Sequence, residues 1–103
     1  MRHLISMTDM SAQDIKTILS IAQKLKSERH AGTHQDYLKN KTMIMLFEKT
    51  STRTRLSFEA AMTELGGHAI FLDKRTTQFA LTDFGHEIQA VLRFGDILMY
   101  RAN

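Results

Sequence analysis

The sequence predicts an α/β fold: a three-layer α-β-α arrangement in which a parallel sheet carries helices on both faces. Short apolar runs typical of buried strands occur at 42–47, 69–72 and 96–100. Segments with helical periodicity come before the first run and between the others. Because helix and strand alternate in the order α-β-α-β-α-β, we expect parallel strands joined by right-handed crossovers.

The first helix is predicted from its start signal and its apolar spacing. Ser11 fits an N-cap, and Asp14 stands three residues later, as in a capping box. The helix is expected to run to about Arg29, after a short extended lead-in at 1–9 whose apolar side chains pack on the body. Its core-facing stripe would consist of Ile15, Ile18, Leu19, Ala22 and Leu25.

The second and third helices lie between the strands. The second is expected from about Arg53 to Leu65, where Gly66 and the glycine after it supply the stop. Thr82 or Asp83 can cap the third, which carries a stripe of apolar residues. That stripe consists of Phe84, Ile88, Val91 and Leu92, and Gly95 ends the helix.

Composition limits the classes of protein to consider. A chain of 103 residues forms one domain at most, and 43% hydrophobic with 24% charged residues is ordinary for a globular protein. The formal charge of +3 suits small anions and, equally, weak nucleic-acid binding. The charge is dispersed and aromatic residues are few, so nucleic acid ranks low as a partner. The absence of cysteine excludes disulfides, thiolate metal sites and a cysteine nucleophile.

Membrane and metal sites are not expected either. No apolar run approaches membrane-spanning length and the N-terminus lacks a signal-peptide pattern, so we expect a cytoplasmic protein. His30 and His34 are four residues apart. Gly32 interrupts them and no third ligand is near, so no metal is expected there.

Residues 51–55, Ser-Thr-Arg-Thr-Arg, form the segment with the strongest functional signal. They follow a strand pattern and open a helix, whose N-terminus presents unpaired N–H groups and a positive dipole end. Hydroxyl and guanidinium groups there would bind phosphate with about 1.5–3 kcal/mol per charge-assisted bond. Arg101 also follows a strand, and carboxyl ends of parallel strands share one edge. Ordinary capping with two solvated arginines remains the alternative.

The wider context of this segment resembles a known family. Residues 47–49 (Phe-Glu-Lys) precede it and residues 56–59 (Leu-Ser-Phe-Glu) follow it. Together they resemble the carbamoyl-phosphate loop of the aspartate/ornithine carbamoyltransferases, and residues 61–69 are also similar to that family. The Phe-Glu-Lys tripeptide resembles the ornithine branch more than the aspartate branch.

The resemblance implies a reaction and a set of partners. Carbamoyl phosphate would be one substrate and an amine the other, expected to be the side-chain amine of ornithine, giving citrulline and phosphate. It implies no cofactor and no metal, and it implies a homo-oligomer, because this family assembles as trimers with shared sites. Putrescine, an acylated ornithine or aspartate remain alternative acceptors.

The resemblance also assigns roles to single residues. Arg53 and Arg101 are implied as catalytic, at the bridging oxygen and at the carbamoyl oxygen. Gln78 matches the region from which the family reaches across a subunit boundary. The implied carbamoyl-phosphate-binding residues are Ser51, Thr52, Arg53, Thr54, Arg101 and Gln78.

Neighbouring residues of the loop receive structural roles. Arg55 stands four residues before Glu59 on a helix, so we expect an ion pair to hold it. Glu48 and Lys49 flank the loop and are expected to position it through an ion pair.

The sequence departs from the family pattern in three places. The helix after the second strand and its loop is one residue shorter than the family's usual spacing. Residues 79–83 do not resemble the segment with Gly and Arg that the ornithine branch carries. The chain ends at Asn103, before the family's His-Pro-x-Gln segment and its amino-acid-binding domain. We therefore expect 1–103 to be a partial carbamoyl-phosphate-binding domain, inactive alone, whose exposed sheet edge favours association.

Two readings outside this enzyme class remain. A non-catalytic phosphate-binding module would use the same loop, although the sequence lacks a Walker loop and a G-x-G-x-x-G turn. A basic structural or RNA-associated domain would use a patch of arginines, Arg53, Arg55, Arg93 and Arg101.

Overall fold

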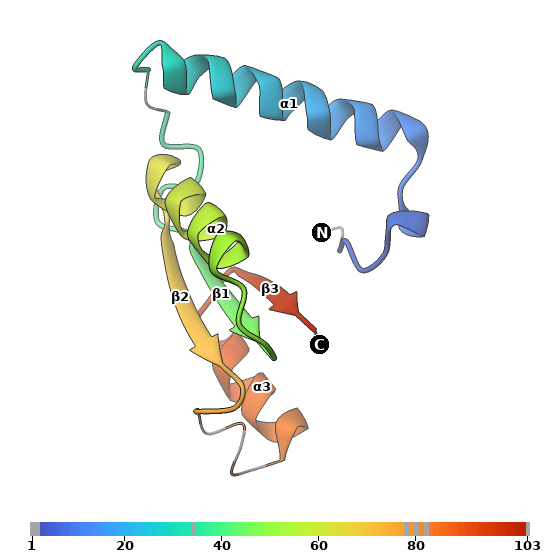
Figure 1. Ribbon diagram of the computed structural model, residues 1–103, viewed down its shortest axis with the longest axis vertical. Coiled ribbons are helices and arrows are strands. Elements are labelled where there is room, and N and C mark those ends of the chain that lie inside the picture. Colours follow the sequence, from blue (N-terminus) through green and yellow to red (C-terminus); the bar gives the residue numbers. More distant parts are fainter. Residues whose placement is uncertain (1–2, 34, 78, 80, 82, 103) are drawn as a thin grey trace. The chain divides into compact units, whose positions relative to one another are not determined.

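The computed structural model describes residues 3–33, 35–77, 79, 81 and 83–102. The chain divides into two compact units, Met1–His34 and Gln35–Asn103. Figure 1 shows the order of the elements along the chain, which alternates helix and strand after a short 3₁₀ turn. None of the helices in the described ranges is both long and apolar enough to cross a membrane.

The first unit consists of a 3₁₀ helix, η1 (Met7–Asp9), and a long helix, α1 (Ala12–His30). The predicted capping box is confirmed. Ser11 Oγ accepts from the Asp14 N–H at 3.1 Å, and Asp14 Oδ2 accepts from the Ser11 N–H at 3.0 Å. The lead-in is not fully extended as predicted, because Ser6 caps η1 through a second capping box.

The apolar stripe of α1 is not buried. No residue of the helix is buried, and Ile18 and Leu19 are 48% and 61% exposed. In the lead-in, Leu4 is 61% exposed. The prediction that these side chains belong to a core is therefore wrong for this unit. A single helix and a short turn offer no second apolar layer.

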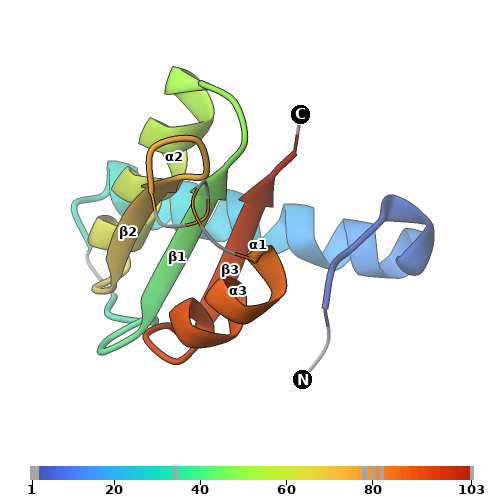
Figure 2. The same cartoon turned by 90° about the horizontal axis from the view of Figure 1, so that it is seen from below.

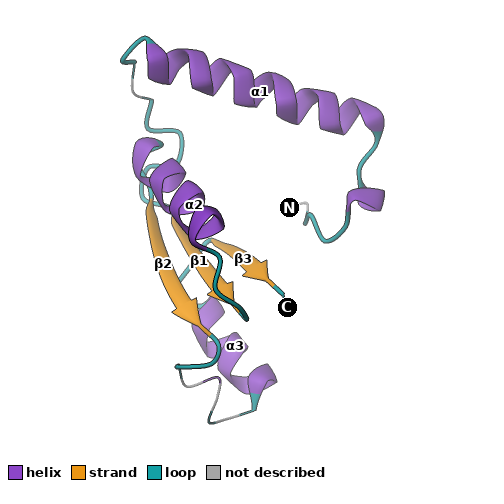
Figure 3. Cartoon of the chain, viewed as in Figure 1, coloured by secondary structure: helices purple, strands orange, loops and turns teal. Residues whose placement is uncertain are grey.

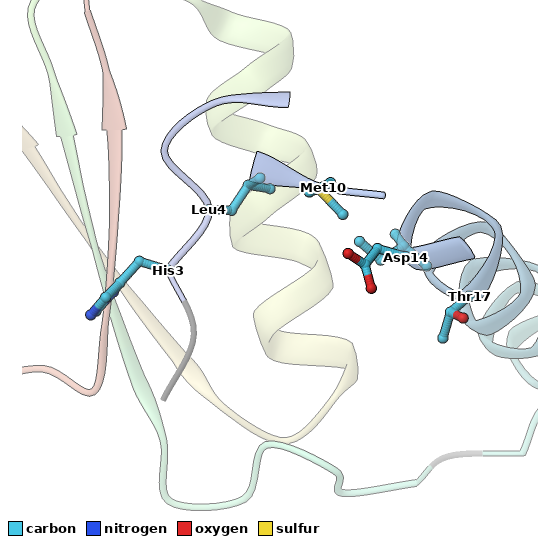
Figure 4. A pocket seen from close by; sticks show the side chains of 6 residues that line it. His3, Leu4, Met10, Asp14 and Thr17 are labelled. Atoms are coloured by element: carbon cyan, nitrogen blue, oxygen red, sulfur yellow. The ribbon is translucent and has the colours of Figure 1, made fainter. Parts of the chain in front are cut away.

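A hollow of about 340 Å³ lies between the lead-in and the start of α1 (Figure 4). In Figure 4, the ring of His3 extends away from Asp14 and Thr17. Asp14 is already engaged by the capping box. The polar side chains around this hollow thus do not converge on one point.

The second unit contains a 3-stranded sheet in the order β2-β1-β3, with all pairs parallel. Its strands are β1 (Thr42–Phe47), β2 (His68–Asp73) and β3 (Ile97–Arg101), and their arrows run the same way in Figure 3. In the register, Phe47 faces Asp73 on one side and Arg101 on the other. The carboxyl ends of the three strands therefore meet at one edge.

Helices α2 (Thr52–Glu64) and α3 (Phe84–Leu92) lie on opposite faces of this sheet (Figures 1 and 2). The chain passes from β1 outward to β2 through α2, then back across β1 to β3 through α3. Crossovers of one hand that run in opposite directions place their helices on opposite faces. The predicted three-layer α/β fold is confirmed.

The core is built around β1, whose residues 43–47 are all buried. Met43, Met45 and Phe47 pack with Met62 of α2, and we call this side of the sheet the α2 face. Ile44 and Leu46 alternate with them and point to the other side, the α3 face. A central parallel strand that is covered on both faces has to be apolar throughout, as the sequence is here.

The stop after α2 requires a glycine. Gly66 has φ +88, a left-handed conformation that side chains with a Cβ rarely adopt. A Cβ at this position would also lie 2.7 Å from Asp36 Oδ1. The predicted end of the helix is confirmed, and so is the predicted Asp83 cap of α3, which accepts from the His86 N–H.

Candidate functional site

The candidate site lies at the carboxyl edge of the sheet, where the segment after β1 turns into α2. The neighbours of β1 are reached by connections that leave in opposite directions, toward β2 and toward β3. Such a switch point is where open α/β sheets bind ligands. The sequence predicted this position from the strand ends, and the register confirms that the ends meet.

The start of α2 has no capping side chain. Ser51 is the N-cap residue, but its hydroxyl donates to Thr54 Oγ1 at 2.8 Å instead of accepting from the helix backbone. In the described helices η1, α1 and α3, by contrast, a side chain of Ser6, Ser11 or Asp83 accepts a first-turn N–H. The first-turn N–H groups of α2 thus remain available to an outside acceptor.

The charge at this helix start is positive. The first turn of α2 contains no acidic residue. Arg53 is exposed, and no described residue forms an ion pair with its guanidinium. The helix dipole places a further partial positive charge there, so this arrangement favours an anion. Thr54 is half-buried. Because Ser51 is the donor in the hydrogen bond between the two hydroxyls, the Thr54 hydroxyl can donate its own proton to another acceptor.

Arg101 lies at the same edge and on the same face. It is the register partner of Phe47, and paired residues of parallel strands project to one side of the sheet. Its side chain therefore lies on the α2 face. Its backbone carbonyl accepts the Glu48 N–H at 2.9 Å, which ties β3 to the beginning of the loop. The fold thus brings Arg101 to the edge that carries residues 51–54.

Arg55 is held by protein groups, as predicted. Its Nε lies 3.4 Å from Glu59 Oε2, and its guanidinium carbon lies 3.8 Å from the centroid of the Phe71 ring. The ion pair was visible in the i, i+4 spacing. The ring contact depends on how α2 packs on β2, which the spacing does not reveal.

Gln78 lies outside the described residues, so its predicted role stays a prediction. The neighbouring Phe79 is 6% exposed, and its ring centroid lies 5.4 Å from that of Phe84. The segment that departs from the family pattern therefore contributes an aromatic side chain to the α3 face.

Glu48 has a different partner from the one expected. Its Oε1 accepts from Lys74 Nζ at 2.9 Å and from the Tyr100 hydroxyl. The expected ion pair with Lys49 is therefore replaced by one with Lys74. Glu48 and Lys74 each follow the last residue of paired strands, so the register places them side by side. Only the pairing of the strands, which sequence spacing does not give, could have revealed this contact.

These contacts change the ionisation of the groups at this edge. The hydrogen bond to Glu48 is the main cause that raises the pKa of Lys74. Burial is the main cause that raises the pKa of Tyr100, and the hydrogen bond to Glu48 adds to it. Hydrogen bonds from Arg75 lower the pKa of Asp73 to about 2.

A second hollow, of about 440 Å³, lies at the opposite edge of the sheet. It is lined by Glu59, Ala60, Thr63, Glu64, His68 and Ala69. Two carboxylates in the lining disfavour a phosphate ligand. Among the described residues, no three side chains of the metal-binding types form a group.

Taken with the fold, this edge defines a class of protein. The central strand of this parallel sheet leads into an uncapped helix start. Two arginines lie at the same edge, and no described residue forms an ion pair with either. Such an arrangement is typical of an anion-binding α/β domain. The profile of the aspartate/ornithine carbamoyltransferase family, carbamoyl-P binding domain, matches residues 2–103. The chain belongs to this family, and the resemblance noted at residues 51–55 is confirmed.

Relatives within the family agree. An ornithine carbamoyltransferase of Archaeoglobus fulgidus is 57% identical over 72 residues, which cover 70% of this chain and 24% of the relative. The structure of ornithine carbamoyltransferase from Pyrococcus furiosus matches 97% of this chain and 32% of its own, at 38% identity and a TM-score of 0.89. The catalytic subunit of aspartate transcarbamoylase from M. jannaschii matches 100% and 35%, at 33% identity and a TM-score of 0.88. The chain thus spans a quarter to about a third of these proteins.

Proposed function

We propose that this chain supplies the carbamoyl-phosphate site of an ornithine carbamoyltransferase. That enzyme moves the carbamoyl group of carbamoyl phosphate to the side-chain amine of ornithine and gives citrulline and phosphate. The observation that carries the proposal is the uncapped start of α2, with Ser51 turned to Thr54 and Arg53 unpaired, at the edge that also holds Arg101. Family membership and the ornithine carbamoyltransferase relatives support the choice of substrates.

In this proposal the phosphate group binds at the start of α2. The backbone N–H groups of the first turn donate to phosphate oxygens, and the hydroxyls of Thr52 and Thr54 add two further donors. Arg53 supplies the full positive charge that a dianion needs. Three or four charge-assisted bonds of about 1.5–3 kcal/mol each are enough for micromolar affinity.

The chemical step follows from charge. The neutral amine attacks the carbamoyl carbon, and the C=O electron pair moves onto oxygen in a tetrahedral intermediate. Arg101 and the Thr54 hydroxyl stabilise that oxyanion. The intermediate then collapses, the bond from carbon to the bridging oxygen breaks, and phosphate leaves with its developing charge opposite Arg53. The amine loses its extra proton to solvent or to phosphate.

The rest of the transferase lies outside this assignment. Because the relatives are about three to four times as long as the matched region, we assign residues 1–103 to part of the carbamoyl-phosphate-binding domain. The groups that bind the acceptor amine belong to other parts of the enzyme. We also propose a cytoplasmic, homo-oligomeric enzyme of the trimer type with Gln78 at a shared site, which needs no cofactor.

Aspartate is the second candidate acceptor. The match to the M. jannaschii aspartate transcarbamoylase subunit covers the whole chain at nearly the same TM-score. In both cases the carbamoyl-phosphate site would be the same, so the two candidates share the binding test below. Assays of the longest available chain with each amine separate them.

Isothermal titration with carbamoyl phosphate and with inorganic phosphate tests the proposal. We expect saturable binding that prefers carbamoyl phosphate, and Arg53→Ala should lower that affinity by about 10- to 100-fold, the value of one charge-assisted bond. Arg93→Ala is the matched control, because it removes the same charge from an exposed position after α3. Equal affinity for both anions, or equal effects of the two substitutions, would contradict the proposal.

A further inference from the structure

We propose that Glu48 is a positioning residue that fixes the phosphate-binding loop and Arg101 relative to each other. It acts together with Lys74 and Tyr100, and we call these three residues the Glu48 network. The inference rests on the proposed function, because it assigns a task to groups around that site. None of the three side chains would touch the ligand.

One carboxylate joins all three strand ends. Glu48 follows β1, Lys74 follows β2, and Tyr100 belongs to β3. A single oxygen, Glu48 Oε1, accepts from Lys74 Nζ at 2.9 Å and from the Tyr100 hydroxyl. The Glu48 side chain is 22% exposed, so these donors replace much of its contact with water.

Aromatic rings hold the two donors in place. Lys74 Nζ lies 4.6 Å from the centroid of the Phe84 ring, a cation–π contact. The same ring meets the Tyr100 ring edge-on, with centroids 6.3 Å apart. Phe84 is the first residue of α3, so the network is also fixed to the helix on its face.

The Glu48 network is connected to Arg101 through the backbone of β3. Tyr100 and Arg101 are successive residues of β3, so their side chains project to opposite faces of the sheet. The Tyr100 hydroxyl is held on the α3 face, which restrains the backbone from which Arg101 projects on the α2 face. The Arg101 carbonyl in turn accepts the Glu48 N–H at 2.9 Å.

The Glu48 network is also connected to the phosphate-binding loop. Residues 48–51 link β1 to α2. Their far end is fixed by the Ser51–Thr54 hydroxyl bond at 2.8 Å, and their near end by Glu48. Without the Glu48 side-chain contacts, the backbone hydrogen bond from the Glu48 N–H to the Arg101 carbonyl would remain, but the position of the loop relative to Arg101 would be less restrained.

The consequence concerns selectivity for the ligand. Inorganic phosphate needs only the start of α2, whereas carbamoyl phosphate has to meet the start of α2 and Arg101 at once. A fault in their relative position therefore lowers the affinity for carbamoyl phosphate more than the affinity for phosphate. A general loss of stability would lower the two affinities by the same factor.

Titration with the two anions tests this prediction on three variants of the full chain. Tyr100→Phe removes one hydroxyl, Glu48→Gln removes the charge, and Lys74→Met removes the ammonium group. We expect each to lower affinity for carbamoyl phosphate by about tenfold, and affinity for phosphate by less than about threefold, the range of one hydrogen bond. Arg75→Met is the matched control, because it removes the same charge from the next residue, which pairs with Asp73 instead. It should leave the ratio of affinities unchanged.

Hydrogen exchange supplies a reading that needs no ligand. The Glu48 N–H, which donates to the Arg101 carbonyl, should exchange faster in Tyr100→Phe than in the unaltered chain, and Arg75→Met should not change it. Equal losses for both anions, or an unchanged exchange rate at Glu48, would overturn the inference. If the unaltered chain binds neither anion while exchange still accelerates in Tyr100→Phe, the proposed function fails and the restraint by the Glu48 network stands.

Discussion

The two faces of the sheet differ sharply at its carboxyl edge. On the α2 face, the first turn of α2 is uncapped, and Arg53 and Arg101 have no ionic partner among the described residues. On the α3 face, a carboxylate, an ammonium group and a phenol are joined by hydrogen bonds over an aromatic ring. At this edge, the α2 face therefore has donors available to a ligand, whereas the polar groups of the α3 face are hydrogen-bonded to one another.

This difference indicates that the α2 face binds the ligand and that the α3 face positions the binding groups. Neighbouring cations repel one another, and side chains without a protein partner can move. Such groups bind an anion well only if the backbone holds them in place. The α3 face contributes no donor to the ligand in our proposal, but it fixes the loop and β3 from behind. In this proposal, the ligand-binding groups on the α2 face thus depend on the hydrogen-bonded Glu48 network on the α3 face.

The largest predicted effect comes from a buried residue of the α2 face at the end of the central strand. Phe47 is 1% exposed at the end of β1, and its ring centroid lies 5.3 Å from that of Phe71. Phe47→Ala leaves a cavity under the loop and should lower the free energy of unfolding by about 3–5 kcal/mol. Urea denaturation followed by circular dichroism measures this change.

Phe94→Ala is the control for Phe47→Ala. It deletes the same ring where the side chain is 77% exposed, so its unfolding midpoint should stay close to that of the unaltered chain. Similar losses in both variants would show that the ring at the strand end is not part of a packed core.

A smaller effect separates the two arginines of the loop. Arg55→Ala removes an ion pair with Glu59 and a cation–π contact with Phe71, together about 1 kcal/mol of stability at this exposed position. Because the Arg55 guanidinium is already engaged by protein groups, it should form no hydrogen bond to the ligand. Affinity for carbamoyl phosphate should therefore change by less than about threefold, which is less than the loss of one charge-assisted hydrogen bond. Denaturation and titration of the same sample measure both quantities. A loss of affinity as large as that of Arg53→Ala would place Arg55 in the site after all.

The sequence predicted the elements and the loop because their signals are local. Apolar runs, capping residues and Gly66 each act within a few positions, and residues 51–54 are contiguous. The convergence of Arg101 on the loop followed from one general property of parallel sheets, that strand ends meet at an edge.

The remainder depends on pairings that a single sequence does not reveal. Lys74 reaches Glu48 because β1 and β2 pair in one register, whereas proximity along the chain favoured Lys49. The stripe of α1 predicts a buried face from its period alone, but burial needs a second layer, which the described residues 3–33 do not supply. Periodicity identifies the apolar face of a helix but does not identify the element that packs against it.

The smallest predicted effect concerns the Asp73–Arg75 ion pair on the α2 face. Asp73 shares that face with Phe47, and Arg75 holds its pKa at about 2, below the ordinary 3.8. A lowered pKa means that the pair stabilises the fold above about pH 4 and that this contribution is lost as the pH falls toward 2. Between pH 5 and pH 2.5, the urea midpoint of Asp73→Asn should therefore fall less than that of the unaltered chain. Lys74 and Tyr100 have raised pKa values, so their protonated forms, and with them the donors of the α3 face, persist throughout this range. Equal falls in both chains would show that the Asp73–Arg75 pair is too exposed to contribute to stability.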